Sequence, residues 1–576
     1  MIKTLHTYIS RELAKVTVLA LVAFTLVLTV FAIVEPLREQ GLAGEQVLAL
    51  FGYTLPVMLS LTLPIGALFA ATIVYGRFSQ DNELLACRAS GISTLSLLKP
   101  ALILALIVTV VSLLLSNFVA PGMAERAGRA VKANIRGIAY NQLRSRKYIE
   151  GELGGNEEAV IHADHVDMDK DILYGVVAVH VRKTTGLPLI AASQSTEIRF
   201  IEREDESYVA FDALYVSGGG FGGLSSGTER RQPFPPIKIP NPAKEKPSWY
   251  PWGKLVGIIR DPQRDPETTR RLARIRREIA QDLFSREVTR AINRGSGGGS
   301  IRLTSGERSY MIRAGSAELG EKGKITLSSQ GDVAVWVVSW AQEVASPAAG
   351  MSFPSASPDA PAPPASAAEW LISIGLPTII VAERGEISTD YDRLSEKSVV
   401  NIELGGGPEP SKGVFVMIPG RGGQRRMEWV TRIGLPARID RQVRHVNLEN
   451  VREEAIRLGS GAEVLSLIKG LEYSYIPSLM GKLIGEMHGR IAYGVSCFAL
   501  VALGAALGLI FRGGQLISAF ATSTLPAAAV IVMVLMGKEL AHNSQVPLVA
   551  GLSVIWGGVA GLAAVCVVVY MYLCRK

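Results

Sequence analysis

Hydrophobic residues are concentrated at the two ends of the chain, and polar residues fill its middle. A helix needs about 20 mostly apolar residues to cross about 30 Å of hydrocarbon. Runs that satisfy this requirement occur before residue 125 and after residue 489, and they cover Val16–Val34, Gln46–Gly76, Pro100–Ala124, Ile491–Phe511, Gly513–Gly537 and Val546–Leu573. The pattern predicts an α-helical membrane protein with six transmembrane helices in a 3+3 arrangement.

Two prolines, Pro56 and Pro64, interrupt the second run. Each proline removes one hydrogen bond within a helix and kinks it. A long tilted helix explains the pattern as well as a wall that opens toward lipid does. No run carries Asp, Glu, Lys or Arg at its centre, which disfavours an ion-driven carrier and favours an apolar path suited to lipid.

Basic residues near the ends of the runs predict the orientation of the chain. They fall on one side if both termini are cytoplasmic: Lys3, Arg11, Lys15, Arg77, Arg88, Lys99, Arg512, Arg575 and Lys576. The first loop on the opposite side is acidic apart from Arg38. The middle of the chain, about 125–489, is then expected to lie outside the cytoplasm.

Many short β-branched or aromatic segments, separated by Gly, Asn and Asp, follow one another through this middle region. Such segments predict strands of a sandwich or jelly roll. We therefore expect membrane parts at 1–124 and 490–576 and an inserted β-jelly-roll-like domain at 125–489. Gly- and Pro-rich or Ala-, Pro- and Ser-rich stretches predict flexible insertions within it at 217–300 and 345–368.

Within the first insertion, Asp265–Arg294 has the pattern of a helix. Asp265 can cap it, with Pro266 at the first helical position. Leu272, Ile275, Ile279 and Leu283 form an apolar stripe, and arginines crowd the first turns. The basic face fits either contact with anionic headgroups or plain exposure to solvent.

The composition is 48% hydrophobic and 19% charged, with a net charge of +8 and no nucleic-acid-binding motif. The four cysteines have the spacing of neither a zinc site nor a disulfide framework. His162 and His165 lie near two aspartates, but alternation along a strand would point them to opposite faces. No Gly-Lys pair is followed by Ser or Thr, so the chain has no phosphate-binding loop for ATP. We expect no catalytic residue, metal or cofactor in this chain, and any ATP must bind a partner.

The loop at 77–99 is the one predicted cytoplasmic connection long enough to receive a partner. Ser79 can cap a short helix near 79–91 and Gly91 can end it. The acidic residues fall in its first turn and Arg88 in its last, as the helix dipole favours. A capped helix between two spans is also suited to being pushed by a motor, and its candidate residues are Arg77, Asp81, Glu83, Leu85, Arg88 and Gly91.

At these residues the chain resembles the LptF/LptG family of permeases, also called YjgP/YjgQ. The similar stretches are the loop with Asp81–Gly91, the segment GEMHGRIAYG at 485–494 and the run LGAALGLIFRGG at 503–514. The order of three spans, periplasmic domain and three spans is also similar. The middle region is more than twice the size usual in the family.

The resemblance implies a bacterial inner-membrane subunit that pairs with a second LptF/LptG-type permease. It implies that a dimeric cytoplasmic ATPase grips the loop, with Glu83 in coupling, and that the pair passes lipopolysaccharide or a related lipid to a periplasmic bridge protein. Arg38, Pro56, Pro64 and Arg490 are the candidates for facing lipid or its headgroup. Two alternatives are a membrane-anchored periplasmic scaffold and a mechanotransmitting permease that moves no lipid.

Overall fold

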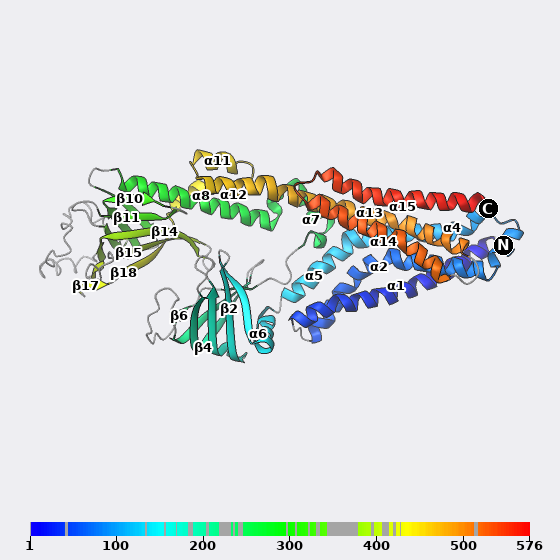
Figure 1. The fold of residues 1–576 in the computed structure, drawn as a ribbon, viewed down its shortest axis with the longest axis horizontal. Coiled ribbons are helices and arrows are strands. Elements are labelled where there is room, and N and C mark those ends of the chain that lie inside the picture. The colour runs from blue at the N-terminus through cyan, green and yellow to red at the C-terminus, as the bar shows by residue number, and fades with distance from the viewer. Residues whose placement is uncertain are drawn as a thin grey trace. The chain divides into compact units, whose positions relative to one another are not determined.

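The fold was analysed in a computed structural model of residues 1–576. It describes the chain except residues 1, 41–43, 133–134, 155–156, 169, 182–187, 203–206, 218–231, 234–236, 240–245, 295–297, 306–307, 321–322, 330–334, 342–377, 393–396, 406–413, 419–421, 427, 512–515 and 576. The predicted insertion at 345–368 therefore lies outside the described residues. The chain divides into two compact units (Figure 1), which are unit 1 (Met1–Asp261 with Pro477–Lys576) and unit 2 (Pro262–Ile476).

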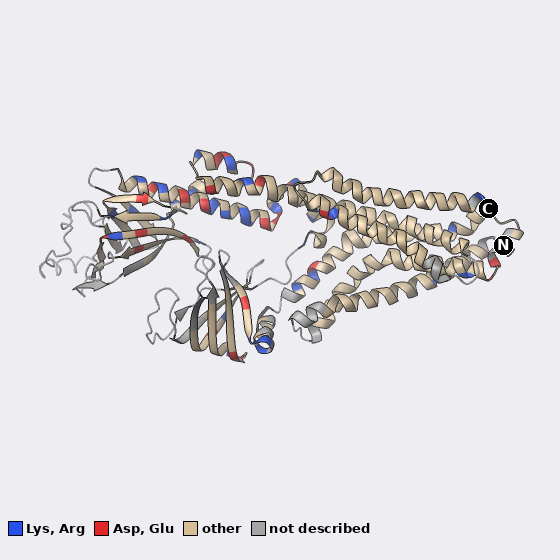
Figure 2. Cartoon of the chain, in the orientation of Figure 1, with Lys and Arg blue, Asp and Glu red and all other residues tan. Residues whose placement is uncertain are grey.

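Unit 1 contains the long apolar helices. In chain order these helices and the short ones between them are α1 (Ile2–Gln40), α2 (Gly44–Gln80), α3 (Glu83–Ala89), α4 (Thr94–Leu114), the π-helix η1 (Leu115–Val119), α5 (Ala120–Lys132), α13 (Ile476–Ile510), α14 (Leu516–His542) and α15 (Leu548–Arg575). Six helical stretches among the described residues are long and apolar enough to cross a membrane. Figure 2 shows that charged residues are sparse along them. Each overlaps one of the predicted runs over most of its length. Phe511 lies just past the end of α13, Gly513 precedes the described start of α14, and Val546 precedes the start of α15.

Helices α2 and α13 lie at the centre of the membrane part. Within their most apolar windows 61% and 67% of the residues are buried, against 22–28% in the four other spans. One apolar cluster joins Ile9 and Leu13 of α1 to Phe78 of α2, and it also contains Leu97, Leu509 and Leu573. Both chain termini and the loop after α2 therefore lie at the same end of the bundle (Figure 1).

The first β module, residues 148–239 of unit 1, is a seven-stranded antiparallel sheet. Its strands are β1 (Tyr148–Gly154), β2 (Glu157–Asp167), β3 (Ile172–Val181), β4 (Pro188–Glu202), β5 (Ser207–Ser217), β6 (Gln232–Pro233) and β7 (Ile237–Ile239). They follow the order β4-β3-β2-β1-β7-β5-β6, and an additional β4–β5 pairing joins the two sides of the sheet. Helix α6 (Ile135–Arg146) packs Tyr140 and Leu143 into the sheet's apolar core.

The second β module fills unit 2 and shares one core between two antiparallel sheets and a helical layer. One sheet has the order β10-β11-β14-β15-β18, with β10 (Ser316–Leu319), β11 (Ile325–Ser328), β14 (Arg384–Asp392), β15 (Lys397–Gly405) and β18 (Glu428–Gly434). The other has the order β17-β16-β13-β12-β9-β8, with β8 (Gly299–Ser305), β9 (Arg308–Ala314), β12 (Val335–Ala341), β13 (Thr378–Ala382), β16 (Val414–Ile418) and β17 (Gly422–Arg426). The helices are α8 (Pro266–Ile292), α10 (Ala437–Val443), α11 (Val451–Arg457) and α12 (Ala462–Gly470), with the π-helix η7 (Leu471–Tyr475) after α12.

Helix α8 confirms the helix predicted from the pattern at 265–294. The Asp265 carboxylate accepts a hydrogen bond from the amide of Thr268 at 2.8 Å and caps the helix, and Pro266 stands at its first position. Leu272, Ile275 and Ile279 are buried in the shared core, so the apolar stripe is what attaches α8 to the sheets.

The structure differs from the predicted middle domain in two respects. The range 125–489 contains two β modules that belong to different units, and the flexible insertion expected over 217–300 contains α7 (Trp252–Arg260) and α8. A strand pattern has the same period wherever the strand pairs, so it cannot show which strands share a core. Beyond this Gly- and Pro-rich stretch, the apolar stripe of α8 packs into the shared core and keeps the helix ordered against the sheets.

Candidate functional site

The loop between the second and third spans is built on the end of α2. Helix α2 continues to Gln80, so Ser79 lies inside it and does not cap the next helix as the sequence analysis expected. Its buried hydroxyl instead donates to the carbonyl of Leu509 on α13 at 3.3 Å. A tight turn follows, in which Asn82 has a φ of 56°, and α3 begins at Glu83.

Helix α3 ends in a Schellman motif. Gly91 has a φ of 81°, which a residue without a β-carbon adopts readily, and the amide of Ile92 donates to the carbonyl of Cys87 at 3.1 Å. Two residues later Ser93 accepts from the amide of Ser96 and caps α4. The helix is therefore closed at a defined point and is followed at once by the third span, as predicted for Gly91.

Charged side chains of both signs are exposed at the start of this loop. Arg77, Asp81 and Glu83 are exposed, whereas the side chains of Leu85 and Arg88 fall outside the described part of the chain. The surroundings are firmly packed: His6 of α1 contacts the carbonyl of Ser96 at 2.9 Å. The Tyr75 hydroxyl donates to the carbonyl of Leu97 at 2.8 Å. An exposed charged helix thus stands on a packed base made of α1, α2 and α4.

Close backbone packing joins α2 to α13. A β-carbon added at Gly504 would lie 2.9 Å from the carbonyl oxygen of Leu68, and one at Gly508 would lie 2.8 Å from that of Thr72. Two glycines four residues apart allow helices in a membrane to approach this closely. A displacement of α2 by the loop would therefore be shared by α13.

Hydrogen bonds from side chains surround the proline-containing part of α2. Tyr493 of α13 donates its hydroxyl to the carbonyl of Leu61 at 2.6 Å, and Ser60 and Thr62 donate to carbonyls one turn earlier. Prolines in a membrane helix are tolerated where neighbours satisfy the backbone around them. Pro64 is buried and Pro56 is half-buried, so α2 meets the rest of the bundle at Pro64 more than at Pro56.

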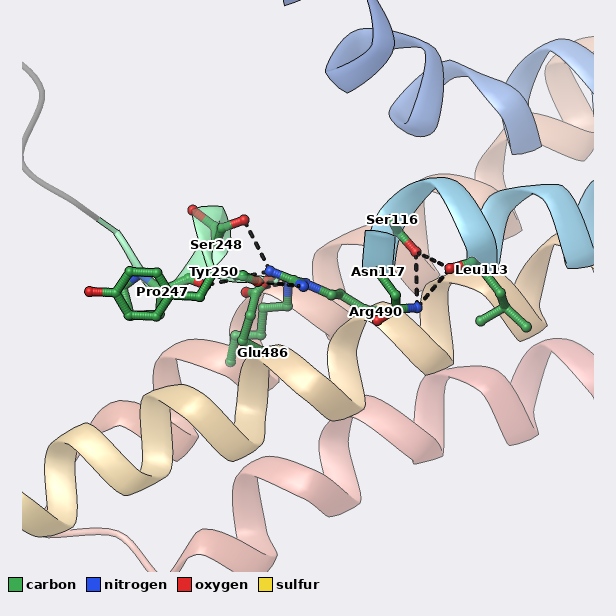
Figure 3. Close-up of polar contacts among 9 residues, drawn as sticks. Leu113, Ser116, Asn117, Pro247, Ser248, Tyr250, Glu486 and Arg490 are labelled. Carbon is green, nitrogen blue, oxygen red and sulfur yellow. Dashed lines mark hydrogen bonds and ion pairs between the residues drawn. The ribbon is translucent and has the colours of Figure 1, made fainter. Parts of the chain in front are cut away.

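A buried ionic network stands on α13 (Figure 3). Arg490 is 5% exposed, and its Nε donates to Glu486 Oε1 at 2.9 Å. Its two terminal nitrogens donate to backbone carbonyls, from Nη1 to Tyr250 at 3.0 Å and from Nη2 to Ser248 at 3.0 Å and Pro247 at 3.4 Å. Glu486 Oε2 accepts a second ion pair from Lys538 of α14 at 3.0 Å.

Residues 7–234 match the family described as lipopolysaccharide export system permease LptF/LptG. This match supports membership of the LptF/LptG permease family. The match covers the first three spans, the α3 loop and most of the first β module. None of the curated proteins compared with the chain matches it. The family described is one of transport permeases of lipopolysaccharide export, and the six candidate spans fit a multi-pass membrane protein.

The structure brings together only some of the residues that sequence analysis assigned to this permease's site. Arg77, Asp81, Glu83 and Gly91 share the α3 loop, whereas Arg38 lies at the other end of α1 and its side chain is outside the described part of the chain. Arg490 does not fit the headgroup role expected for it. Its guanidinium is buried and its donors are directed to Glu486 and to three carbonyls.

Several contacts at the candidate site were not predicted from the sequence. The Glu486–Arg490 spacing of four on one helix is a signal for an ion pair, and the spacing of Gly504 and Gly508 is a signal for close packing. The contacts of Arg490 with residues 247–250 carry no such signal, because they span about 240 positions. No group of three His, Cys, Asp or Glu side chains in the described ranges could hold a metal ion, and His162 approaches only Asp164, at 4.0 Å.

Proposed function

We propose that the chain is one permease subunit of an ABC-type exporter that extracts lipopolysaccharide, or a related lipid, from the inner membrane. In this proposal it pairs with a second LptF/LptG-type permease and passes the lipid to a periplasmic bridge protein. A dimeric cytoplasmic ATPase supplies the energy. The observation that carries the proposal is the α3 loop, a closed short helix with exposed Asp81 and Glu83 at its start, on the end of the most deeply packed pair of spans.

The packing around the α3 loop would transmit a displacement of α3 to the spans α2 and α13. Only the turn at Asp81–Asn82 separates α3 from α2, and α2 is bound to α13 through Ser79, Gly504 and Gly508. Interfaces packed this closely move as bodies and do not deform gradually. Force applied to α3 by an ATPase would shift α2 and α13 together, and with them the wall of any cavity they border.

The α2 wall suits a lipid and not an ion. From Gln46 to Gly76 this helix carries no Asp, Glu, Lys or Arg. Ion-coupled carriers need ionisable groups at that depth, because an ion or proton must be bound on its way across. Pro64 removes one helical hydrogen bond from this wall, and the bond from Tyr493 to Leu61 holds the backbone one turn earlier, so we infer that the wall can bend here.

The position of the α3 loop supports one orientation of the chain across the membrane. Both termini lie at the same end of the bundle as α3, and the basic residues predicted to be cytoplasmic include Lys3, Arg11 and Arg77 near that end. Loops of this kind are enriched in Lys and Arg on the cytoplasmic side. The proposal therefore places α3 and both termini in the cytoplasm and both β modules in the periplasm.

The proposal is tested by charge reversal on α3. The full chain is expressed with its partner permease and ATPase, and the ATPase that co-purifies with it is quantified for Glu83→Lys. We expect at least about tenfold less ATPase, because reversing a charge that a partner contacts costs more than about 1.4 kcal/mol. Glu539→Lys is the matched control, since Glu539 is 84% exposed on α14 at the far end of the spans.

Two outcomes would reject the proposal. Equal ATPase recovery for Glu83→Lys and Glu539→Lys would show that α3 is not where the motor docks. Normal growth and lipid export in cells whose chain binds no ATPase at all would favour the periplasmic scaffold. Crosslinking of lipopolysaccharide to a photoreactive residue at Leu61 separates an exporter from a permease that transmits force without moving lipid.

A further inference from the structure

The segment Pro247–Tyr250 contacts two of the membrane helices in unit 1. It follows the first β module in the chain and precedes α7, and it forms the short 3₁₀-helix η2 (Pro247–Trp249). Within the segment the amide of Trp249 donates to the carbonyl of Lys246 and that of Tyr250 to the carbonyl of Pro247. Carbonyls of the segment also accept hydrogen bonds from another element.

The donor of these hydrogen bonds is the guanidinium of Arg490, and all three of its nitrogens take part in hydrogen bonds. Nη1 donates to the Tyr250 carbonyl, Nη2 to those of Ser248 and Pro247, and Nε points back to Glu486 on the same helix. Figure 3 shows the guanidinium lying between the segment and Glu486. A planar fork with five donors can serve four acceptors in one place, whereas the three donors of a lysine on a flexible stem cannot reproduce this arrangement.

Glu486 and Lys538 hold Arg490 in position. Glu486 receives Arg490 on one oxygen and Lys538 on the other, so the buried cluster contains two cations and one anion. The stem of Lys538 passes over Gly489, where an added β-carbon would lie 2.1 Å from Lys538 Cε. The network thus attaches α14 to α13 at the level of the clamp. Losing one partner of such a buried cluster is costly, because a desolvated charge remains.

A second anchor holds the segment from the opposite side. The ring of Trp249 lies over Gly128 of α5, where an added β-carbon would be 2.8 Å from Cζ3. Helix α5 continues the third span, and Arg490 belongs to the helix of the fourth. Residues 247–250 therefore bridge the two halves of the membrane part at the point where the chain leaves the first β module.

We propose that Arg490 and residues 247–250 form a clamp that passes movement of the fourth span to the first β module. Arg490 is a positioning residue that touches no lipid. The clamp is required for lipid to enter the first β module and not for ATP hydrolysis. This inference rests on the proposed export function, which supplies the movement.

The test uses Arg490→Lys and Gly128→Leu, which break the two anchors of the clamp separately. Lys482→Met is the control for the first, since Lys482 is exposed on the same helix, and Gly122→Leu is the control for the second, since an added β-carbon there meets nothing within 4 Å. Each full chain is reconstituted with the second permease and the ATPase in proteoliposomes containing lipopolysaccharide. A photoreactive residue replaces Phe211 in the core of the first β module.

We expect both clamp variants to keep ATP hydrolysis within about twofold of the parent. ATP-dependent crosslinking of lipopolysaccharide at position 211 should fall about tenfold in both. For Arg490→Lys this is the factor expected when hydrogen bonds to a charged group are lost, and for Gly128→Leu the added side chain displaces the Trp249 ring. Amide hydrogen exchange over 246–255 should accelerate in both variants, while that of α14 stays unchanged. A structural role alone would lower hydrolysis and crosslinking together.

The clamp is rejected if exchange over 246–255 accelerates and crosslinking is unaffected, because the released segment would then transmit nothing. It is equally rejected if exchange over 246–255 does not change. If the parent chain gives no ATP-dependent crosslink at position 211, the export function fails instead. Exchange in the variants then still decides whether Arg490 holds the segment.

Discussion

The hydroxyl of Tyr475 donates a 2.8 Å hydrogen bond to the Asp265 carboxylate, and this bond joins the two ends of unit 2. Asp265 is 4% exposed and already accepts from the amide and hydroxyl of Thr268. Arg271 lies 4.2 Å from the centre of the Tyr475 ring. The cap of α8 is thus also the place where the chain enters and leaves the second β module.

Tyr475→Phe should therefore loosen the start of α8 without unfolding the module. The variant removes one bond to a buried carboxylate, and we expect a local loss of about 1 kcal/mol or somewhat more. Hydrogen exchange of the amides at Thr268 and Thr269 should accelerate about tenfold. The control is Tyr473→Phe, because Tyr473 is 62% exposed in the same π-helix. Equal exchange in the two variants would contradict the role given to Tyr475.

Asp265 also shows which contacts can be predicted from the sequence and which cannot. Its cap, the proline after it and the apolar stripe of α8 are local patterns, and they predict the helix to within a residue or two. The spans are equally predictable, because about 20 apolar residues have few alternatives. Tyr475 lies 210 positions from Asp265, and Arg490 lies about 240 from its carbonyl partners. Such pairs depend on tertiary packing, which leaves no period in the sequence.

The β modules show the same limit. Alternation predicts strands such as β2 and β3, but the assignment of strands to two modules depends on which side chains share a core. For the loop, Gly91 was predictable because a left-handed residue after a short helix favours glycine. Ser79 was not, because the continuation of α2 through it depends on contact with α13.

Glu278 of α8 should make the stability of the chain depend on pH. Burial raises the pKa of its carboxyl, Glu463 raises it further, and Arg274 and Arg277 oppose the shift. The folded chain then holds this proton more tightly than the unfolded chain does. Its contribution is complete below the unfolded pKa and is lost as pH rises through the raised folded value.

Glu278→Gln should accordingly stabilise the chain most at high pH. We expect its unfolding temperature to exceed that of the parent at about pH 8, with the difference shrinking toward about pH 4, since the parent carboxyl is then protonated. Thermal unfolding of both full chains in detergent across this range measures the difference. Glu403→Gln, for which the carboxyl lies on β15, is the control. A difference independent of pH would show that burial of Glu278 does not govern its protonation.

Gly508 should be indispensable for the contact between α2 and α13. A leucine there would place its β-carbon 2.8 Å from the Thr72 carbonyl and 3.0 Å from the Gly76 amide, both of which are backbone atoms that cannot turn away. We expect Gly508→Leu to cost more than about 2 kcal/mol. Its unfolding temperature in detergent should fall well below that of Gly557→Leu, the control on α15 where an added β-carbon meets nothing within 4 Å. Similar values for both would show that the two central helices are not held by this approach.

Cys87 provides the test of orientation, because it lies in α3 and is partly exposed. In a chain that also carries Cys566→Ser and Cys574→Ser, a membrane-impermeant maleimide should leave Cys87 unlabelled in intact spheroplasts and should label it after detergent is added. The remaining cysteine, Cys497, is buried and should stay unlabelled both before and after detergent is added. A matched chain with Cys87→Ser and Glu318→Cys, exposed on β10, should be labelled from outside. Labelling of Cys87 before detergent would put α3 on the periplasmic side, where no ATPase could reach it, and both the motor and the clamp would then lose their source of movement.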